Sequence, residues 1–244
     1  MPTYYLCSGF GMEHSFVNKF GELLSADLPI RNSLVAIPCT EDLNELQAHL
    51  SFFTEQLAEA GIIFNKHVIL SSAMSHDEQC KHINNANFIY FMGGYPFDQK
   101  EFILKNRLEY ALRSYHGVAL GISAGAMNMS RYIIMVTDGL NSNEIHIEEG
   151  LGLVDFSVFP HCAFSGDDFA PSFCIGSDLV DSKALLQASQ GKGTVYFLQN
   201  KTETNTLKIS FIRVANNSPQ FISMFDGKVW KSTENGFEII KDYI

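Results

Sequence analysis

The sequence predicts an α/β protein with a mostly parallel sheet, helices on both of its faces and a β-rich second half. Short apolar runs alternate with amphipathic stretches up to about Ser130, which is typical of strands joined by helices. After Ser130, strand-like runs follow one another with few helices between them. No repeat, low-complexity tract or linker interrupts the 244 residues, so we expect one domain over 1–244.

Five strands are expected in the first half, and each is a short apolar run. They are Tyr4–Ser8, Ser33–Pro38, His67–Ser71, Asn87–Met92 and 117–122. A helix is expected after the second strand, with Thr40 as its cap, Glu41 and Asp42 in its first turn, and Gly61 at its end. Its apolar stripe is Leu43, Leu46, Leu50, Phe53 and Leu57.

A second helix should present Leu104, Leu108, Ala111, Leu112 and Tyr115 on one face. The strands expected in the second half are Tyr132–Val136, Asp155–Phe159, Gly193–Leu198, Thr206–Val214 and Gln220–Phe225. One further helix is expected over Asp178–Ala188.

Composition narrows the functional classes. The chain is 46% hydrophobic and 12% aromatic, which is enough for a sizeable core, and its net charge of −10 disfavours a nucleic-acid partner. Five cysteines without a C-x-x-C pair indicate neither a disulfide framework nor a zinc ribbon, and we expect no metal and no cofactor. No apolar run approaches 18 residues, so we expect a soluble cytoplasmic protein without a membrane partner.

The stretch Gly117–Ala126 carries the strongest functional signal. It predicts a buried strand, a sharp turn at Ser123 and a helix of small residues. Glycine stands at 121 and 125, the two positions where a side chain would clash in so tight a turn. This G-x-S-x-G pattern is a nucleophile elbow, which holds a serine hydroxyl above the N-terminus of the following helix. The sequence therefore predicts a hydrolase with Ser123 as nucleophile.

A serine nucleophile needs a base, a group that orients the base, and donors for the oxyanion. Among the eight histidines, His161 follows the apolar run Val158–Pro160 and should lie at a strand end, where catalytic groups of α/β folds collect; His146 is the rival. The N–H groups of Ala124 and of the Gly93-Gly94 loop are the expected oxyanion donors. The candidate acids are Asp138, Asp155, Asp167 and Asp168.

These features together resemble peptidase family S51, the group of dipeptidase E and cyanophycinase. Gly121–Ala126 is similar to the family's G-x-S-A-G-A, and Phe91–Gly94 to its strand that ends in glycines. Pro160-His161 lies 38 positions after Ser123, close to the family's Pro-His, and Asp138 lies 15 positions after Ser123, where dipeptidase E has its triad acid. The similarity extends from the first strand to about His161.

The resemblance implies a serine peptidase on a three-layer, class I glutamine-amidotransferase-like (flavodoxin-like) fold. It implies a triad of Ser123, His161 and Asp138, with Gly94 and Ala124 lining the oxyanion hole and Gly93 beside them. A small peptide is the implied substrate and a homodimer is a candidate assembly, although the sequence leaves the oligomeric state open. Tyr95 departs from the pattern, because the family has glycine there, so we expect Tyr95 to shape the substrate pocket.

Specificity for an N-terminal Asp is not predicted. Arg131 is the only basic residue between Ser123 and Asp138, and it lies earlier than the family's Asp-binding residue would suggest. Three alternatives remain open. An esterase or amidase of the α/β-hydrolase class normally has its histidine near the C-terminus, and a glutamine amidotransferase would have cysteine at 123. A non-catalytic relative would keep the elbow only as a turn.

Overall fold

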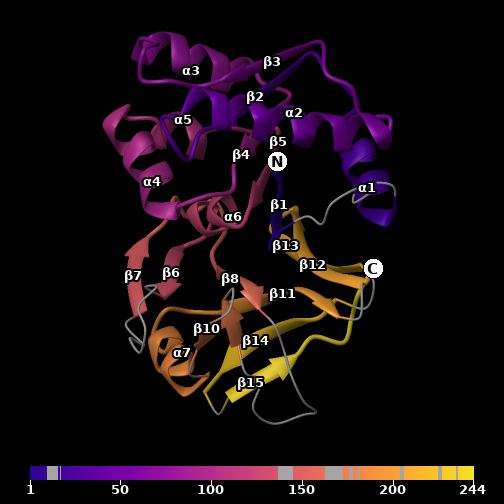
Figure 1. Ribbon diagram of the computed structural model, residues 1–244, viewed down its shortest axis with the longest axis vertical. Helices are drawn as coiled ribbons and strands as arrows, with labels where there is room; N and C mark the ends of the chain where they lie inside the picture. The colour runs from indigo at the N-terminus through magenta and orange to yellow at the C-terminus, as the bar shows by residue number, and fades with distance from the viewer. Residues whose placement is uncertain are drawn as a thin grey trace.

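The computed structural model describes residues 1–9, 16, 18–136, 145–162, 173–175, 178–180, 182–203, 206–224, 227–234 and 236–244. Within these residues, an eleven-stranded sheet runs through the molecule in the order β15-β14-β11-β12-β1-β5-β4-β2-β3, with β13 on β12 and β8 on β11 (Figure 1). The expected mixed α/β fold with a large central sheet is confirmed.

The parallel part of the sheet is formed by the first five strands. They are β1 (Thr3–Cys7), β2 (Ser33–Ile37), β3 (Lys66–Ile69), β4 (Phe88–Phe91) and β5 (Val118–Ile122). All neighbours in the order β3-β2-β4-β5-β1 run parallel. Each expected strand is present within one or two residues, because four- to six-residue apolar runs bounded by loops are the pattern of buried parallel strands.

Helices cover both faces of this sheet. The helices are α1 (Lys19–Asp27), α2 (Leu43–Glu59), α3 (His76–Asn85), α4 (Pro96–Lys105), α5 (Glu109–Arg113) and α6 (Ala124–Met129). Successive side chains of β1 point to opposite faces of the sheet. Tyr5 and Cys7 pack in one core with α1 and α2, whereas Tyr4 and Leu6 pack in a second core with α3 to α6. The two cores give the three layers that the sequence predicts.

Two helix expectations are corrected. Asp42, not Thr40, caps α2, because its carboxylate accepts the N–H groups of Asn44 and Glu45; Leu43 is consequently exposed at the first position of the helix. The helix expected over 104–115 is instead two helices, α4 and α5, and Leu104 is 48% exposed.

The break between α4 and α5 is a Schellman motif. Leu108 N–H donates to the carbonyl of Ile103, Arg107 N–H donates to that of Leu104, and Arg107 has a φ of 56°. Glycine usually occupies this left-handed position. Because Arg107 stands there instead, the sequence does not indicate that a helix ends at this point.

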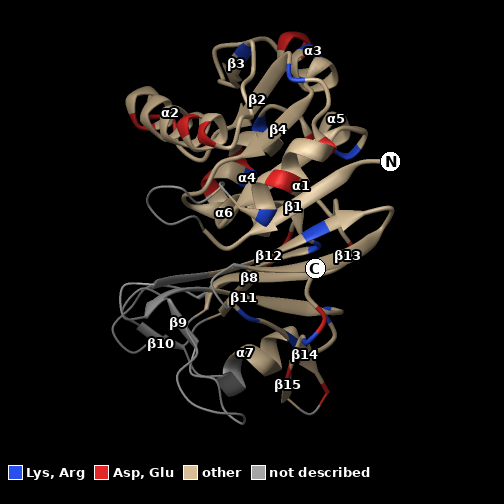
Figure 2. Ribbon diagram, turned by 90° about the vertical axis from the view of Figure 1, so that its right-hand side faces the viewer, with Lys and Arg blue, Asp and Glu red and all other residues tan. Residues whose placement is uncertain are grey.

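The second half is rich in strands, as expected. The elements are β6 (Tyr132–Val136), β7 (Ile145–Glu149), β8 (Ser157–Cys162), β9 (Phe173–Ile175), β10 (Asp178–Val180), α7 (Ser182–Ser189), β11 (Val195–Glu203), β12 (Thr206–Ala215), β13 (Ser218–Met224), β14 (Val229–Thr233) and β15 (Gly236–Ile239). Strand β12 pairs antiparallel with β1 and so joins this half to the parallel sheet. Figure 2 shows the parallel sheet with its helices above and the antiparallel strands below.

Two expectations for this half are corrected in position. The helix expected from Asp178 begins only at Ser182, since 178–180 form β10. The strand expected over Asp155–Phe159 is β8, which starts at Ser157 and continues to Cys162, so that Pro160 and His161 lie within the strand. In the part of the chain that the structure describes, none of the helices has the length and apolar character needed to cross a membrane.

Candidate active site

Ser123 stands at the sharp turn between β5 and α6. Strand β5 ends at Ile122 and α6 begins at Ala124, while Ser123 itself has φ 51° and ψ −111°. Its N–H donates to the carbonyl of Cys7 on β1 over 2.8 Å, and its carbonyl accepts the N–H of Met127 over 3.0 Å. These two backbone bonds hold a conformation that is unfavourable for a residue with a side chain.

The glycines at 121 and 125 let α6 pass close to the sheet. A Cβ at Gly121 would lie 2.5 Å from the N atom of Ala126, and one at Gly125 would lie 2.2 Å from the carbonyl oxygen of Phe91. Both obstacles are backbone atoms, which cannot rotate away. The spacing of the pattern around Ser123 is thus a packing requirement between β4, β5 and α6.

His161 lies beside Ser123. Its Nε2 is 2.6 Å from the Ser123 hydroxyl oxygen, a hydrogen bond between residues 38 positions apart. Burial lowers the pKa of His161 from its ordinary value, so the imidazole is neutral near pH 7 and has a lone pair to accept a proton. The backbone of His161 is also left-handed, with φ 58°.

Ser8 fixes the backbone of His161, and the sequence analysis did not identify it. The buried Ser8 hydroxyl accepts the N–H of His161 over 2.6 Å and donates to the carbonyl of Leu198 over 3.3 Å. Ser8 follows β1, His161 lies on β8 and Leu198 on β11, so one hydroxyl links three strands. The sequence offers only a polar residue at the end of an apolar run, because the pairing of β1 with β5 is visible only in the fold.

The other candidates for base and acid are distributed as follows. His146 lies on the exposed side of β7, whereas His161 contacts Ser123. Asp155 is exposed and precedes β8, at the end of the strand away from His161. Asp138, Asp167 and Asp168 lie outside the described residues.

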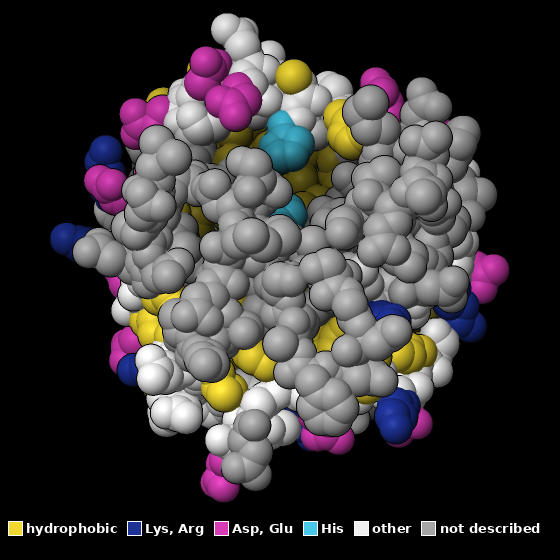
Figure 3. Space-filling model, turned by 60° about the horizontal axis from the view of Figure 1, so that its bottom comes forward, with side chains coloured by type: hydrophobic (Ala, Val, Ile, Leu, Met, Phe, Trp, Pro, Cys, Tyr) yellow, Lys and Arg dark blue, Asp and Glu magenta, His cyan; other side chains and the backbone are white. Residues whose placement is uncertain are grey.

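The Gly93-Gly94 loop follows β4, the strand next to β5. Gly94 has φ 145°, in the region that side chains rarely adopt, and it is exposed. Within the described residues, the N–H groups of Gly94 and Ala124 donate to no acceptor. Figure 3 shows histidine side chains at a hollow in one face of the molecule, with hydrophobic side chains at its floor.

Tyr95 projects from the same loop. It is 46% exposed, precedes Pro96 at the start of α4, and stacks edge-on with Phe97 at a centroid distance of 5.7 Å. An aromatic pair therefore stands directly after the glycines that are candidates for oxyanion binding.

Two buried amides join the loop to α6, and neither was singled out from the sequence. Asn128 Nδ2 lies within donating distance of the carbonyls of Ala124 and Pro96 and of the Gln99 side-chain oxygen, at 2.9 to 3.2 Å. Gln99 Nε2 donates to the carbonyls of Ile37 and Met92, at 3.1 and 3.0 Å. Because unpaired amides are costly in a core, this network fixes the loop relative to the helix that begins after Ser123.

A sharp turn with serine above a parallel sheet, and histidine within hydrogen-bonding distance of it, defines the class of hydrolases that use a serine nucleophile. The model of peptidase family S51 matches residues 10–207, more than half of the chain. The chain therefore belongs to peptidase family S51 and is a serine-type peptidase.

Two solved structures are similar in fold. A peptidase from an acI-B1 Actinobacterium has a TM-score of 0.61 and 16% identity, with 99% of this chain and 95% of that chain covered. A structure assigned as a peptidase E protein from Listeria monocytogenes EGD-e has a TM-score of 0.59 and 17% identity, with 92% of this chain and 99% of that chain covered. None of the curated proteins compared with the chain matches it.

Proposed function

We propose that this protein hydrolyses the peptide bonds of small peptides, in the manner of dipeptidase E, with Ser123 as nucleophile and His161 as general base. The observation that supports this most directly is the 2.6 Å contact between the Ser123 hydroxyl oxygen and His161 Nε2. Two residues 38 positions apart meet at hydrogen-bonding distance, one at a strained turn and the other held through its backbone by Ser8.

In the first step, the Ser123 hydroxyl oxygen attacks the peptide carbonyl carbon while His161 Nε2 takes the hydroxyl proton. The carbonyl oxygen becomes an oxyanion, for which the N–H groups of Gly94 and Ala124 are the proposed donors. His161 then gives its proton to the nitrogen of the leaving amine as the C–N bond breaks. In the second stage, His161 takes a proton from water as the water oxygen attacks the acyl carbon. The ester bond to Ser123 then breaks, His161 returns the proton to the Ser123 oxygen, and the acid product leaves.

We assign Asp138 as the acid that orients His161. The assignment rests on its spacing of 15 positions from Ser123, as in dipeptidase E. A carboxylate on the second ring nitrogen would hold the tautomer in which Nε2 is free to accept the proton.

The substrate is proposed to be small because Tyr95 stands where the family has glycine. Tyr95 is half exposed and follows Gly94 directly, and we propose that its ring narrows the space beside the attacked carbonyl. The same ring offers an apolar surface to the substrate side chain.

The test is Ser123→Ala, assayed on a panel of dipeptides and tripeptides and by labelling with a fluorophosphonate probe. Hydrolysis should fall at least about thousandfold and labelling should disappear, with an unchanged melting temperature. His146→Ala is the matched control and should keep wild-type rates. Peptide hydrolysis that persists in Ser123→Ala would refute the proposal. Labelling of the wild type together with hydrolysis of esters alone would favour an esterase, and no labelling would favour a binding protein.

A further inference from the structure

Cys39 lies behind the Gly93-Gly94 loop, on the side away from solvent. It follows β2 by two residues and is almost completely buried. Its thiol donates to the carbonyl oxygen of Gly93, with Sγ and O 2.6 Å apart. Strand β2 pairs with β4, so the end of one strand supports the loop that leaves the other.

This bond determines the direction of the next N–H group. The peptide between Gly93 and Gly94 is planar and trans, as no cis peptide occurs in the described chain, so its C=O and N–H point in opposite directions. With the Gly93 oxygen directed at Cys39, the N–H of Gly94 is directed away from Cys39. Gly94 is exposed and its N–H has no acceptor within the described part of the chain.

The preceding peptide is held in a similar way. Gln99 Nε2 donates to the carbonyl of Met92 over 3.0 Å. Two successive carbonyls of the loop thus have side-chain donors, and the first N–H after them is the one proposed for the oxyanion. Without the Cys39 donor, the Gly93–Gly94 peptide would be free to rotate, because glycine on both sides permits many backbone angles.

The chemistry of the thiol fits a donor. Burial, with contributions from Glu45 and Asp98, raises the pKa of Cys39 to about 11. The thiol therefore keeps its proton throughout the neutral range. The available space fits as well, because a Cβ at Gly94 would lie 2.5 Å from Cys39 Sγ, so the thiol and the glycine are packed against each other.

We propose that Cys39 is a positioning residue that orients the Gly94 N–H toward the oxyanion. The proposal rests on the proposed serine peptidase function. We expect Cys39 to affect the rate at which Ser123 is acylated. It should not affect how tightly the substrate binds before reaction, because its thiol points away from the substrate.

The test compares Cys39→Ala and Cys39→Ser by the rate at which a fluorophosphonate probe labels Ser123, which needs no knowledge of the substrate. The maximal labelling rate of Cys39→Ala should fall about tenfold with an unchanged probe affinity, because a misdirected oxyanion donor costs rate rather than binding. Cys39→Ser retains a donor and should stay within about threefold of the wild type.

Cys80→Ala is the matched control, since Cys80 lies on α3 and among the described residues its thiol is within hydrogen-bonding distance of His76 alone. All variants are assayed well below their melting temperatures. Wild-type labelling rates in Cys39→Ala would overturn the role of Cys39 and leave the proposed function intact. An equal loss in Cys39→Ser would overturn it too, because the hydrogen bond would then not be what matters. Absence of labelling in the wild type would remove the proposed function and this role with it.

Discussion

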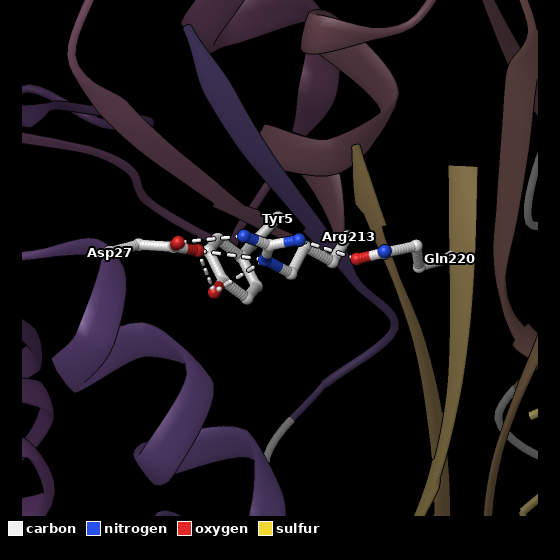
Figure 4. Close-up of polar contacts among 4 residues, drawn as sticks. All are labelled: Tyr5, Asp27, Arg213 and Gln220. Carbon is white, nitrogen blue, oxygen red and sulfur yellow. Dashed lines mark hydrogen bonds and ion pairs between the residues drawn. The ribbon is translucent and has the colours of Figure 1, made fainter. Parts of the chain in front are cut away.

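Arg213 on β12 forms a two-pronged ion pair with Asp27, the last residue of α1 (Figure 4). Its Nη2 and Nε lie 2.6 and 2.7 Å from the two carboxylate oxygens. Tyr5 on β1 donates to the same carboxylate, and Gln220 on β13 accepts from Arg213. Four elements from both ends of the chain therefore meet at one largely buried charge pair, next to the strand that leads to Ser8.

Asp27→Ala should lower the free energy of unfolding by about 2 to 4 kcal/mol, because it leaves Arg213 and Tyr5 without their shared acceptor. Urea denaturation measures this loss. Glu238→Ala is the control, since it breaks the exposed pair with Lys231 and should cost less than about 1 kcal/mol. Equal losses in the two variants would contradict the structural importance of the Asp27 pair.

Ser8→Ala should reduce kcat about tenfold or more with little change in KM, because it frees the backbone that carries the His161 ring. Steady-state kinetics on the best peptide of the panel measures this. Ser189→Ala removes another buried hydroxyl, which donates to the carbonyl of Leu186 within α7, and should leave kcat unchanged. The prediction fails if both serine variants lose activity alike.

The pH dependence follows from the lowered pKa of His161. The base works only when neutral, so kcat/KM should rise with pH through a midpoint below 6.5 and then level off. A pH-rate profile on a substrate without titrating groups measures it. A midpoint clearly above 6.5 would contradict the burial of the ring as the dominant cause.

Stability should change in the same pH range. A histidine whose folded pKa lies below its unfolded value binds fewer protons when folded, so the free energy of unfolding rises with pH until it levels off above about 6.5, and it falls as the solution is made more acidic. His49, whose pKa burial also lowers, contributes with the same sign. In His161→Gln the free energy of unfolding should fall less below pH 6.5 than it does in the wild type. Urea denaturation at several pH values measures this, and identical profiles for the two proteins would contradict a contribution of His161.

Tyr95→Gly restores the small residue typical of the family and should change the ranking of substrates. We expect kcat/KM for peptides with a bulky side chain at the cleaved bond to change about tenfold relative to small ones, because the aromatic wall beside Gly94 is removed. Tyr110→Gly, an exposed tyrosine on α5, is the control for loss of an aromatic ring and should leave the ranking intact. An unchanged ranking in Tyr95→Gly would remove Tyr95 from the pocket.

The sequence predicted what depends on local pattern. The five parallel strands are visible as apolar runs, and the turn at Ser123 is visible because backbone contacts of Gly121 and Gly125 exclude other residues there. The end of α4 was missed, since Arg107 takes the left-handed position that glycine normally marks. Helix α3 was missed although Ser75 caps it, because its polar surface gives only a short apolar stripe.

The supporting residues of the site could not be found from the sequence for a different reason. Ser8, Cys39 and Gln99 act on residues 153, 54 and 7 positions away. The Cys39 contact joins the ends of the neighbouring strands β2 and β4. The order β12-β1-β5-β4-β2 differs from the order along the chain, and only the folded topology brings these partners together. A serine or glutamine in a linear sequence carries no mark of the strand that will lie beside it.

The same order of strands has a consequence for synthesis on the ribosome. A chain that has emerged as far as β5 and α6 contains the Ser123 turn, but His161 is still to be made, and so is Leu198, to which Ser8 donates. Strand β12, which covers the open edge of β1, is made later still. If Ser123 and His161 act as proposed, a growing polypeptide has its nucleophile before it has its base, and we expect it to hydrolyse no peptides until the strands that carry His161 and Leu198 have been made.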